Sequence, residues 1–184
     1  MLLKRVPRGA GWMTYSYFAG FAIQGLYFIL LARALGSAEY GVFIGALSLA
    51  SVFSSLSGIG GGNVLVLETA RNSSRYRVQL GTALVYIGAT FVPLVIGSVV
   101  FANAVASNVV VSLVPLLLSE LMFNRIYDVG LQSFQAHDRL RGVAHLNVAS
   151  SGLRLLVCSL FLALGFQNSS NWAWFYAGVT ITMA

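Results

Sequence analysis

Long apolar segments, separated by short polar stretches, are the feature that most constrains the fold of this chain. A helix needs about 20 mostly apolar residues to cross the hydrocarbon core of a bilayer. Five segments reach such a length and a sixth is cut short: 12–32, 40–67, 78–102, 109–131, 143–165 and 172–184, with approximate bounds. The sequence therefore predicts an all-α, polytopic transmembrane bundle of about six spans. We expect residues 1–184 to be the N-terminal bundle of a longer protein.

The composition favours a membrane protein over a soluble one. Apolar residues make up 58% of the chain and charged residues only 9%, whereas about a quarter of a typical soluble domain is charged. The formal net charge of +6 could suggest a nucleic acid partner. The basic residues, however, stand in short clusters between apolar segments, as they do in the loops of membrane proteins. We therefore expect no nucleic acid partner.

The basic clusters also predict the orientation in the membrane. Eight of the eleven lysines and arginines precede the first span or lie in the second or fourth loop: Lys4, Arg5, Arg8, Arg71, Arg75, Arg77, Arg139 and Arg141. Because loops rich in Lys and Arg stay in the cytoplasm, the N-terminus is predicted to be cytoplasmic. The apolar run from Trp12 to Ala32 is longer than the core of a signal peptide, which favours an uncleaved span.

Aromatic residues near the predicted span ends are expected to anchor the helices at the membrane interfaces, where Trp and Tyr are enriched. They are Tyr15, Tyr17, Tyr40, Trp172, Trp174 and Tyr176. This predicts that Trp172 and Tyr176 lie at a membrane surface.

The stretch from Leu31 to Glu68 is predicted to join two antiparallel spans by a very short turn, because Gly36 can end the first helix. Gly41 and Gly45 are four residues apart and share one helix face, where another helix can approach closely. Four further glycines are expected to loosen the cytoplasmic end of the second span: Gly58, Gly60, Gly61 and Gly62.

Two prolines lie inside predicted spans, Pro93 in the third and Pro115 in the fourth. Both fall in the outer half of the bilayer, where each weakens its helix. They fit ordinary kinks, and they also fit a bending zone for outward closure. Both interpretations remain open.

Ionisable side chains inside predicted spans mark the candidate site, because charges within a bilayer usually face the protein interior and pair or serve a function. Glu120 on the fourth span and Arg154 on the fifth each lie about 16 Å from a span end and are predicted to meet near the midplane. Gln24 on the first span lies at similar depth. Further polar residues follow along one side of the fourth span: Asn124, Arg125 and Asp128.

Two interpretations of these residues remain open. In the first, Glu120 and Arg154 form a buried ion pair that only fixes the register of the helices. In the second, Arg154 attracts a diphosphate, with Arg125 nearer the cytoplasm, because guanidinium geometry suits phosphate oxygens. Glu120 then holds Arg154 in place or takes up a proton.

The sequence carries no motif of known catalytic or cofactor chemistry, so we expect neither an enzyme nor a bound cofactor. The glycine-rich stretch at 58–63 lacks the Lys and the Ser or Thr of a phosphate-binding loop. His137 and His145 have no nearby third ligand in the sequence, so a metal site is not expected. Cys158 is the single cysteine and can form no intrachain disulfide.

The residues around the first turn form a recognisable pattern: Leu31, Ala32, Arg33, Leu35, Gly36, Glu39, Tyr40 and Gly41. A helix of small residues and the glycine-rich stretch at 58–62 follow them. This pattern resembles the opening of the bacterial oligosaccharide flippase family, which exports O-antigen and exopolysaccharide. The family belongs to the multidrug/oligosaccharidyl-lipid/polysaccharide exporter superfamily. The resemblance implies the N-terminal half of a two-bundle transporter in the inner (plasma) membrane, whose bundles rock about a central cavity.

The resemblance further implies a lipid-linked oligosaccharide of the undecaprenyl-diphosphate type as substrate, flipped by alternating access. Membrane lipids and polysaccharide polymerase or assembly proteins are the partners it implies. The segment 132–142 is expected to be a solvated loop at the membrane surface, and contact with the lipid-linked diphosphate is the alternative.

Two other classes remain open. One is an ion-coupled multidrug or metabolite antiporter of the same superfamily, against which the excess of basic residues over Glu120 and Asp128 in the spans argues weakly. The other is a non-transporting membrane protein or a membrane-embedded enzyme, for which no nucleophile or metal set is visible.

Overall fold

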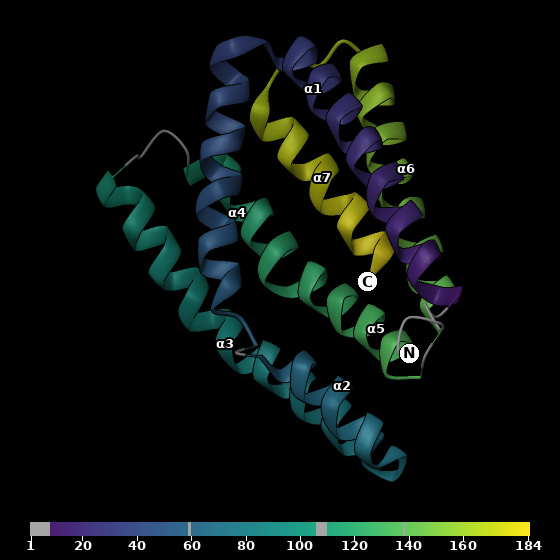
Figure 1. The fold of residues 1–184 in the computed structure, drawn as a ribbon. Helices are drawn as coiled ribbons and strands as arrows, with labels where there is room; N and C mark the ends of the chain where they lie inside the picture. The colour runs from purple at the N-terminus through teal and green to yellow at the C-terminus, as the bar shows by residue number, and fades with distance from the viewer. Residues whose placement is uncertain (1–7, 59, 106–109, 138) are drawn as a thin grey trace.

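The structure is a computed structural model that describes residues 8–58, 60–105, 110–137 and 139–184. These residues form helices and no strands (Figure 1). The elements in chain order are α1 (Arg8–Ser55), α2 (Gly61–Arg71), the 3-10 turn η1 (Ser73–Arg75), α3 (Tyr76–Val105), α4 (Val110–Leu118), the π-helical turn η3 (Ser119–Phe123), α5 (Asn124–Ala136), α6 (Leu140–Ala163) and α7 (Ser169–Met183). The all-α prediction is confirmed for the described part of the chain.

Four helical segments are long and apolar enough to cross a membrane: Gly11–Ser55, Tyr76–Val105, Val110–Ala136 and Leu140–Ala163. This agrees with the prediction of a membrane protein. The count of about six spans and the orientation stay predictions. Lys4 and Arg5, on which the orientation partly rests, lie outside the described residues, as do Asp138 and the expected start of the fourth span at residue 109.

A single glycine folds α1 into a hairpin. Gly36 has φ 73° and ψ 171°, a left-handed backbone that glycine adopts without steric cost and that cannot continue a helix. Residues 8–35 (the first leg) and 37–55 (the second leg) therefore run antiparallel, as Figure 1 shows. The predicted short turn is confirmed. A Cβ at Gly41 would meet no atom within 4 Å, so the close helix approach predicted at that glycine is wrong.

The predicted second span at 40–67 is not one continuous helix. The second leg ends at Ser55, and α2 begins only at Gly61. Gly58 and Gly60 both have positive φ, near 71° and 72°, and two left-handed residues so close together cannot lie within a helix. We call residues 56–58 together with Gly60 the helix break. Contrary to the prediction, these glycines do not loosen the end of a span but interrupt it within the depth of the bundle.

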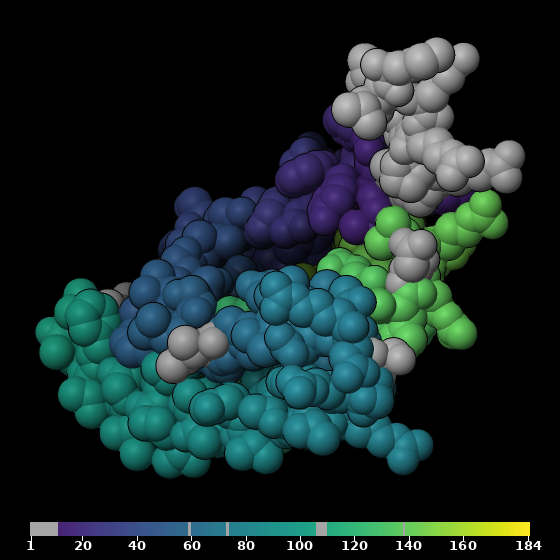
Figure 2. Space-filling view, turned by 60° about the horizontal axis from the view of Figure 1, so that its bottom comes forward, coloured from purple at the N-terminus to yellow at the C-terminus, as the bar shows by residue number. Residues whose placement is uncertain are grey.

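The first leg packs along α6 with both helices running in the same direction. Trp12 contacts His145 near the start of both helices, with ring centroids 5.8 Å apart. Further along, the Cys158 thiol lies 4.0 Å from the carbonyl oxygen of Tyr27. Short helices complete the bundle. α7 lies between the legs and α6 (Figure 1), and α2 packs along α3 and α5 (Figures 1 and 2).

The core is centred on α7. Trp172 is 1% exposed, and its ring lies 5.0 Å from that of Phe161 on α6 and 6.5 Å from that of Phe43 on the second leg. Tyr176, one turn later, is also buried. The prediction that Trp172 and Tyr176 anchor the chain at a membrane surface is therefore wrong. Trp174, on another face of the same helix, is 58% exposed, as an anchor would be.

The two prolines have different surroundings. α3 runs without interruption through Pro93. Pro115 lies in α4, and the helix changes to a π-helical turn at Ser119, one turn after the proline. π-helical turns are rare and frequently lie at functional sites. The choice between an ordinary kink and a bending zone stays open at both prolines.

Candidate functional site

Glu120 lies on the π-helical turn and is 7% exposed. Its Oε1 accepts a hydrogen bond from the Tyr176 hydroxyl at 2.7 Å, and its Oε2 accepts one from the Asn124 side-chain amide at 3.1 Å. Two donors suit a carboxylate, whose oxygens only accept. The structure thus brings the predicted residues Glu120 and Asn124 together and adds Tyr176.

Arg154 does not form an ion pair with Glu120 among the described residues. Its guanidinium lies over the Tyr176 ring, with Cζ 5.1 Å from the ring centroid. Its Nε is buried without a hydrogen-bond partner, and neither an ion pair nor a hydrogen bond of this side chain is found within the described ranges. The prediction that Glu120 and Arg154 meet directly is corrected: Tyr176 connects them, with its hydroxyl on Glu120 and its ring against Arg154.

Tyr176 is the residue that sequence reasoning missed. Its position near the end of a predicted span indicates an interfacial anchor instead. Tyr176 follows the first residue of α7, Ser169, by seven positions, which places it about 10 Å along the helix. A hydroxyl at that depth needs a buried acceptor, and this signal could have linked it to Glu120.

Arg154 also lines a groove between the first leg and α6, which Leu47 of the second leg and Tyr176 of α7 border. A hollow of about 40 Å³ is lined by Gln24, Tyr27, Phe28, Leu47, Ser151, Arg154 and Tyr176. A second hollow of about 190 Å³ is lined by Ser16, Tyr17, Gly20, Phe21, Gln24, Asn147, Ser150 and Ser151. Because both hollows share Gln24 and Ser151, we treat them as one feature, the α1–α6 groove. Its lining offers hydroxyl and amide groups, with the Arg154 cation at one end.

Arg125 faces the helix break rather than Arg154. Its Nε donates to Ser54 Oγ at 3.1 Å, and its Nη2 donates to the Ser54 carbonyl oxygen. Its Nη1 lies 3.5 Å from Asp128 Oδ2. The last carbonyls of a helix lack partners within the helix and carry partial negative charge. Arg125 therefore caps the second leg, and Asp128 balances part of its charge.

Serine hydroxyls connect the same region to the π-helical turn. Ser54 Oγ donates to the Glu120 carbonyl oxygen at 3.0 Å, and Ser57 Oγ donates to the Leu121 carbonyl oxygen at 3.1 Å. Glu120 follows Val110 by ten residues, about 15 Å along that span. The helix break therefore lies within the depth of the bundle and not at its end.

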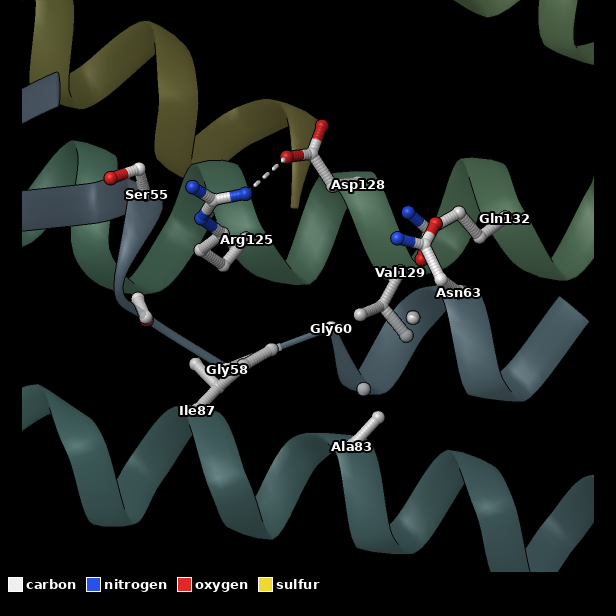
Figure 3. A pocket seen from close by; sticks show the side chains of 13 residues that line it. Ser55, Gly58, Gly60, Asn63, Ala83, Ile87, Arg125, Asp128, Val129 and Gln132 are labelled. Atoms are coloured by element: carbon white, nitrogen blue, oxygen red, sulfur yellow. Dashed lines mark hydrogen bonds and ion pairs between the residues drawn. The ribbon is translucent and has the colours of Figure 1, made fainter. Parts of the chain in front are cut away.

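A cavity of about 210 Å³ opens at this break (Figure 3). We call it the helix-break cavity. Its lining residues are Ser55, Ser57, Gly58, Gly60, Gly61, Gly62, Asn63, Ala83, Ile87, Arg125, Asp128, Val129 and Gln132. Gln132 packs directly on the backbone of α2, since a Cβ at Gly62 would come within 1.5 Å of its Oε1.

The six predicted site residues thus form two groups. Glu120, Asn124, Gln24 and Arg154 gather around Tyr176, whereas Arg125 and Asp128 line the helix-break cavity. Glu120 lies on the π-helical turn, and Asn124, Arg125 and Asp128 follow it on α5. Among the described residues, no cluster of three or more His, Cys, Asp or Glu side chains could hold a metal ion.

Comparison with known proteins gives no further constraint: no family model, no curated protein and no solved structure matches this chain.

Proposed function

We propose that this chain is the N-terminal bundle of a transporter that flips a polyprenyl-diphosphate-linked oligosaccharide across the inner membrane by alternating access. In this proposal the N-terminus is cytoplasmic and the polar head group passes through the bundle. The lipid tail stays in the bilayer. The fold class, with its long apolar helices, is compatible with this role.

The observation that carries the proposal is that the Arg154 guanidinium has no acidic partner among the described residues. Arg154 follows Leu140 by fourteen residues, about 21 Å along a 24-residue helix, and therefore lies far from both helix ends. A charge at such depth is costly and usually serves a function when it has no ionic partner. A register-fixing ion pair with Glu120 would have explained Arg154 without any substrate, and that pair is not formed.

The surroundings of Arg154 suit a phosphorylated sugar. A guanidinium presents several N–H donors in a planar fork that matches phosphate oxygens. The hydroxyl and amide groups of the α1–α6 groove, from Gln24 to Asn147, offer hydrogen bonds to a polyhydroxylated head group. The groove therefore combines the two kinds of contact that a sugar diphosphate needs.

The helix break supports the part of the proposal that requires the bundle to change conformation. Non-helical backbone at membrane depth is tolerated only where it is buried in protein or lines a water-filled cavity. Such discontinuous helices are typical of the binding regions of secondary transporters. Here the break lines a polar cavity next to the π-helical turn, and these are two adjacent irregular points at which the bundle can bend.

The test is export of the polymer by cells that carry Arg154→Ala. We expect export to be lost while the protein level stays normal, because the cation is removed without breaking an ion pair. Arg154→Lys keeps the charge without the fork and should retain part of the activity. Arg71→Ala, an exposed arginine on α2 paired with Glu68, is the matched control and should export normally.

Normal export by Arg154→Ala would contradict the proposal. The double exchange Glu120→Arg with Arg154→Glu should not restore export, because the Tyr176 hydroxyl would then face a guanidinium. Restoration would indicate a simple charge pair. Ion-coupled efflux of small organic cations that survives in Arg154→Ala would point to an antiporter instead.

A further inference from the structure

A third hollow lies where α3 and α6 begin and α5 ends. It has a volume of about 240 Å³ and is lined by Tyr76, Ser133, Phe134, His137 and Arg139. Tyr76 is the first residue of α3, His137 follows the last residue of α5, and Arg139 precedes the first residue of α6. We call it the Tyr76–Arg139 hollow. It shares no lining residue with the α1–α6 groove or the helix-break cavity.

The His137 ring and the backbone at Arg139 are held in place by their neighbours. The His137 ring lies edge-on to the Tyr76 ring, with centroids 5.0 Å apart and planes at 82°. His137 Nδ1 donates to the Ser133 carbonyl oxygen at 2.8 Å, which leaves Nε2 free of this bond. The Arg139 backbone N–H donates to the Phe134 carbonyl oxygen at 2.9 Å and closes the turn, while the Arg139 side chain is exposed.

Neighbouring side chains place this end of the bundle at the level of the lipid headgroups. The Arg141 guanidinium lies 5.6 Å from the ring centroid of Trp12, which is partly exposed. Trp residues concentrate at the boundary between headgroups and hydrocarbon, and arginines extend from there toward the headgroups. Arg139 precedes Arg141 by two residues, so the hollow opens where headgroup phosphates lie.

We infer that the Tyr76–Arg139 hollow binds the phosphate of an anionic phospholipid headgroup. Arg139 provides the charged N–H fork, and the His137 imidazole and the Tyr76 hydroxyl provide further hydrogen-bonding groups. Basic hollows between transmembrane helices on the positively charged side are typical of such lipid sites. The same chemistry would recognise a polyprenyl diphosphate. The bilayer lipid is favoured because the hollow lies at the membrane surface, apart from the groove that holds Arg154.

The inference does not depend on the transport proposal and is tested on the purified chain in detergent. The unfolding temperature is measured while short-chain phosphatidylglycerol or phosphatidylcholine is added, since a ligand that binds the folded state raises it. We expect stabilisation by phosphatidylglycerol only. Arg139→Ala should weaken the apparent affinity about tenfold, the loss typical of one charged hydrogen bond. Arg71→Ala, the control on another helix, should leave it unchanged.

A second variant and further ligands allow the inference to be tested even if Arg139→Ala fails to fold. Tyr76→Phe keeps the ring contact with His137 and should weaken phosphatidylglycerol binding severalfold. Equal stabilisation by both lipids, or equal binding by wild type, Arg139→Ala and Tyr76→Phe, would overturn the inference. Inorganic phosphate and farnesyl diphosphate test whether the bound phosphate comes from a phospholipid or from another ligand. If either binds as tightly as phosphatidylglycerol and loses affinity in Arg139→Ala, the phosphate site is supported and the phospholipid source is overturned.

Discussion

At the scale of single residues, Tyr176 decides how the buried charges coexist. A buried carboxylate requires hydrogen-bond donors, and a buried guanidinium benefits from an aromatic face. Tyr176 supplies one donor to Glu120 through its hydroxyl and an aromatic face to Arg154 through its ring. Glu120 is thereby satisfied without using Arg154, which leaves the guanidinium available on the groove side.

Tyr176→Phe tests whether the Tyr176 hydroxyl stabilises buried Glu120. The variant removes the hydroxyl while keeping the ring against Arg154, and it leaves one oxygen of buried Glu120 without its donor. We expect a loss of about 1–3 kcal/mol in the free energy of unfolding, the usual cost of an unsatisfied buried polar group. The measurement is reversible unfolding in detergent.

Tyr17→Phe is the control for this prediction, because Tyr17 lies on the first leg and is exposed. It should change the free energy of unfolding by less than about 0.5 kcal/mol, as is usual for surface positions. Equal effects of Tyr17→Phe and Tyr176→Phe would show that the Tyr176 hydroxyl contributes nothing to Glu120.

At the scale of elements, the interrupted second span is stabilised by its neighbour. The second leg ends inside the bundle, where its last carbonyls cannot all reach water. Arg125 on α5 supplies a donor to the Ser54 carbonyl. The hydroxyls of Ser54 and Ser57 in turn donate to carbonyls of the π-helical turn. The end of the second leg thus receives a donor from α5 and supplies donors to the turn.

Arg125→Ala should therefore destabilise the fold more than the loss of an ordinary ion pair. The variant removes the cap of the second leg and leaves Asp128 without its partner. We expect a loss of about 2 kcal/mol in the free energy of unfolding, since the group donates to a helix carbonyl inside the bundle.

Arg71→Ala is a matched control for Arg125→Ala, because Arg71 also pairs with an acidic residue three positions away, Glu68, but is 69% exposed. It should cost less than about 1 kcal/mol, as exposed ion pairs do. Similar losses for the two variants would argue that Arg125 is not a cap.

The turn at Gly36 could be predicted from the sequence, whereas the depth of the helix break could not. A glycine between two apolar runs directly marks a chain reversal. The cluster at residues 58–62 marks only a weak point in a helix, and its position in the bundle depends on which neighbour it meets. That neighbour is the π-helical turn at Ser119–Phe123, for which the sequence shows only Pro115 four residues earlier.

At the scale of the whole molecule, one tryptophan of α7 lies in the aromatic core and another lies on the apolar surface. The membrane character could be predicted from the length of the apolar segments alone. The assignment of aromatic residues to core or interface could not be predicted, because apolar residues lie all around α7 and no polar face marks its exposed side. Trp172 is enclosed by the first leg, the second leg and α6, whereas Trp174 is exposed.

Single-tryptophan variants reconstituted with brominated lipids test this arrangement. Bromine quenches indole fluorescence only at short range, so a variant that keeps Trp174 should be strongly quenched. A variant that keeps Trp172 should be protected, because protein surrounds it on all sides. Equal quenching of the two variants would contradict the packing of α7 in the centre of the bundle.

The pairing of the first leg with α6 sets an order of events during synthesis. The ribosome releases Ser16 and Gln24 more than a hundred residues before it releases Asn147 and Ser151, which face them across the groove. Until then these polar side chains have no α6 to cover them, and the insertion machinery or neighbouring water must shelter them. The first leg therefore meets this partner late, and a ribosome that stalls before Leu140 leaves its polar side chains without α6.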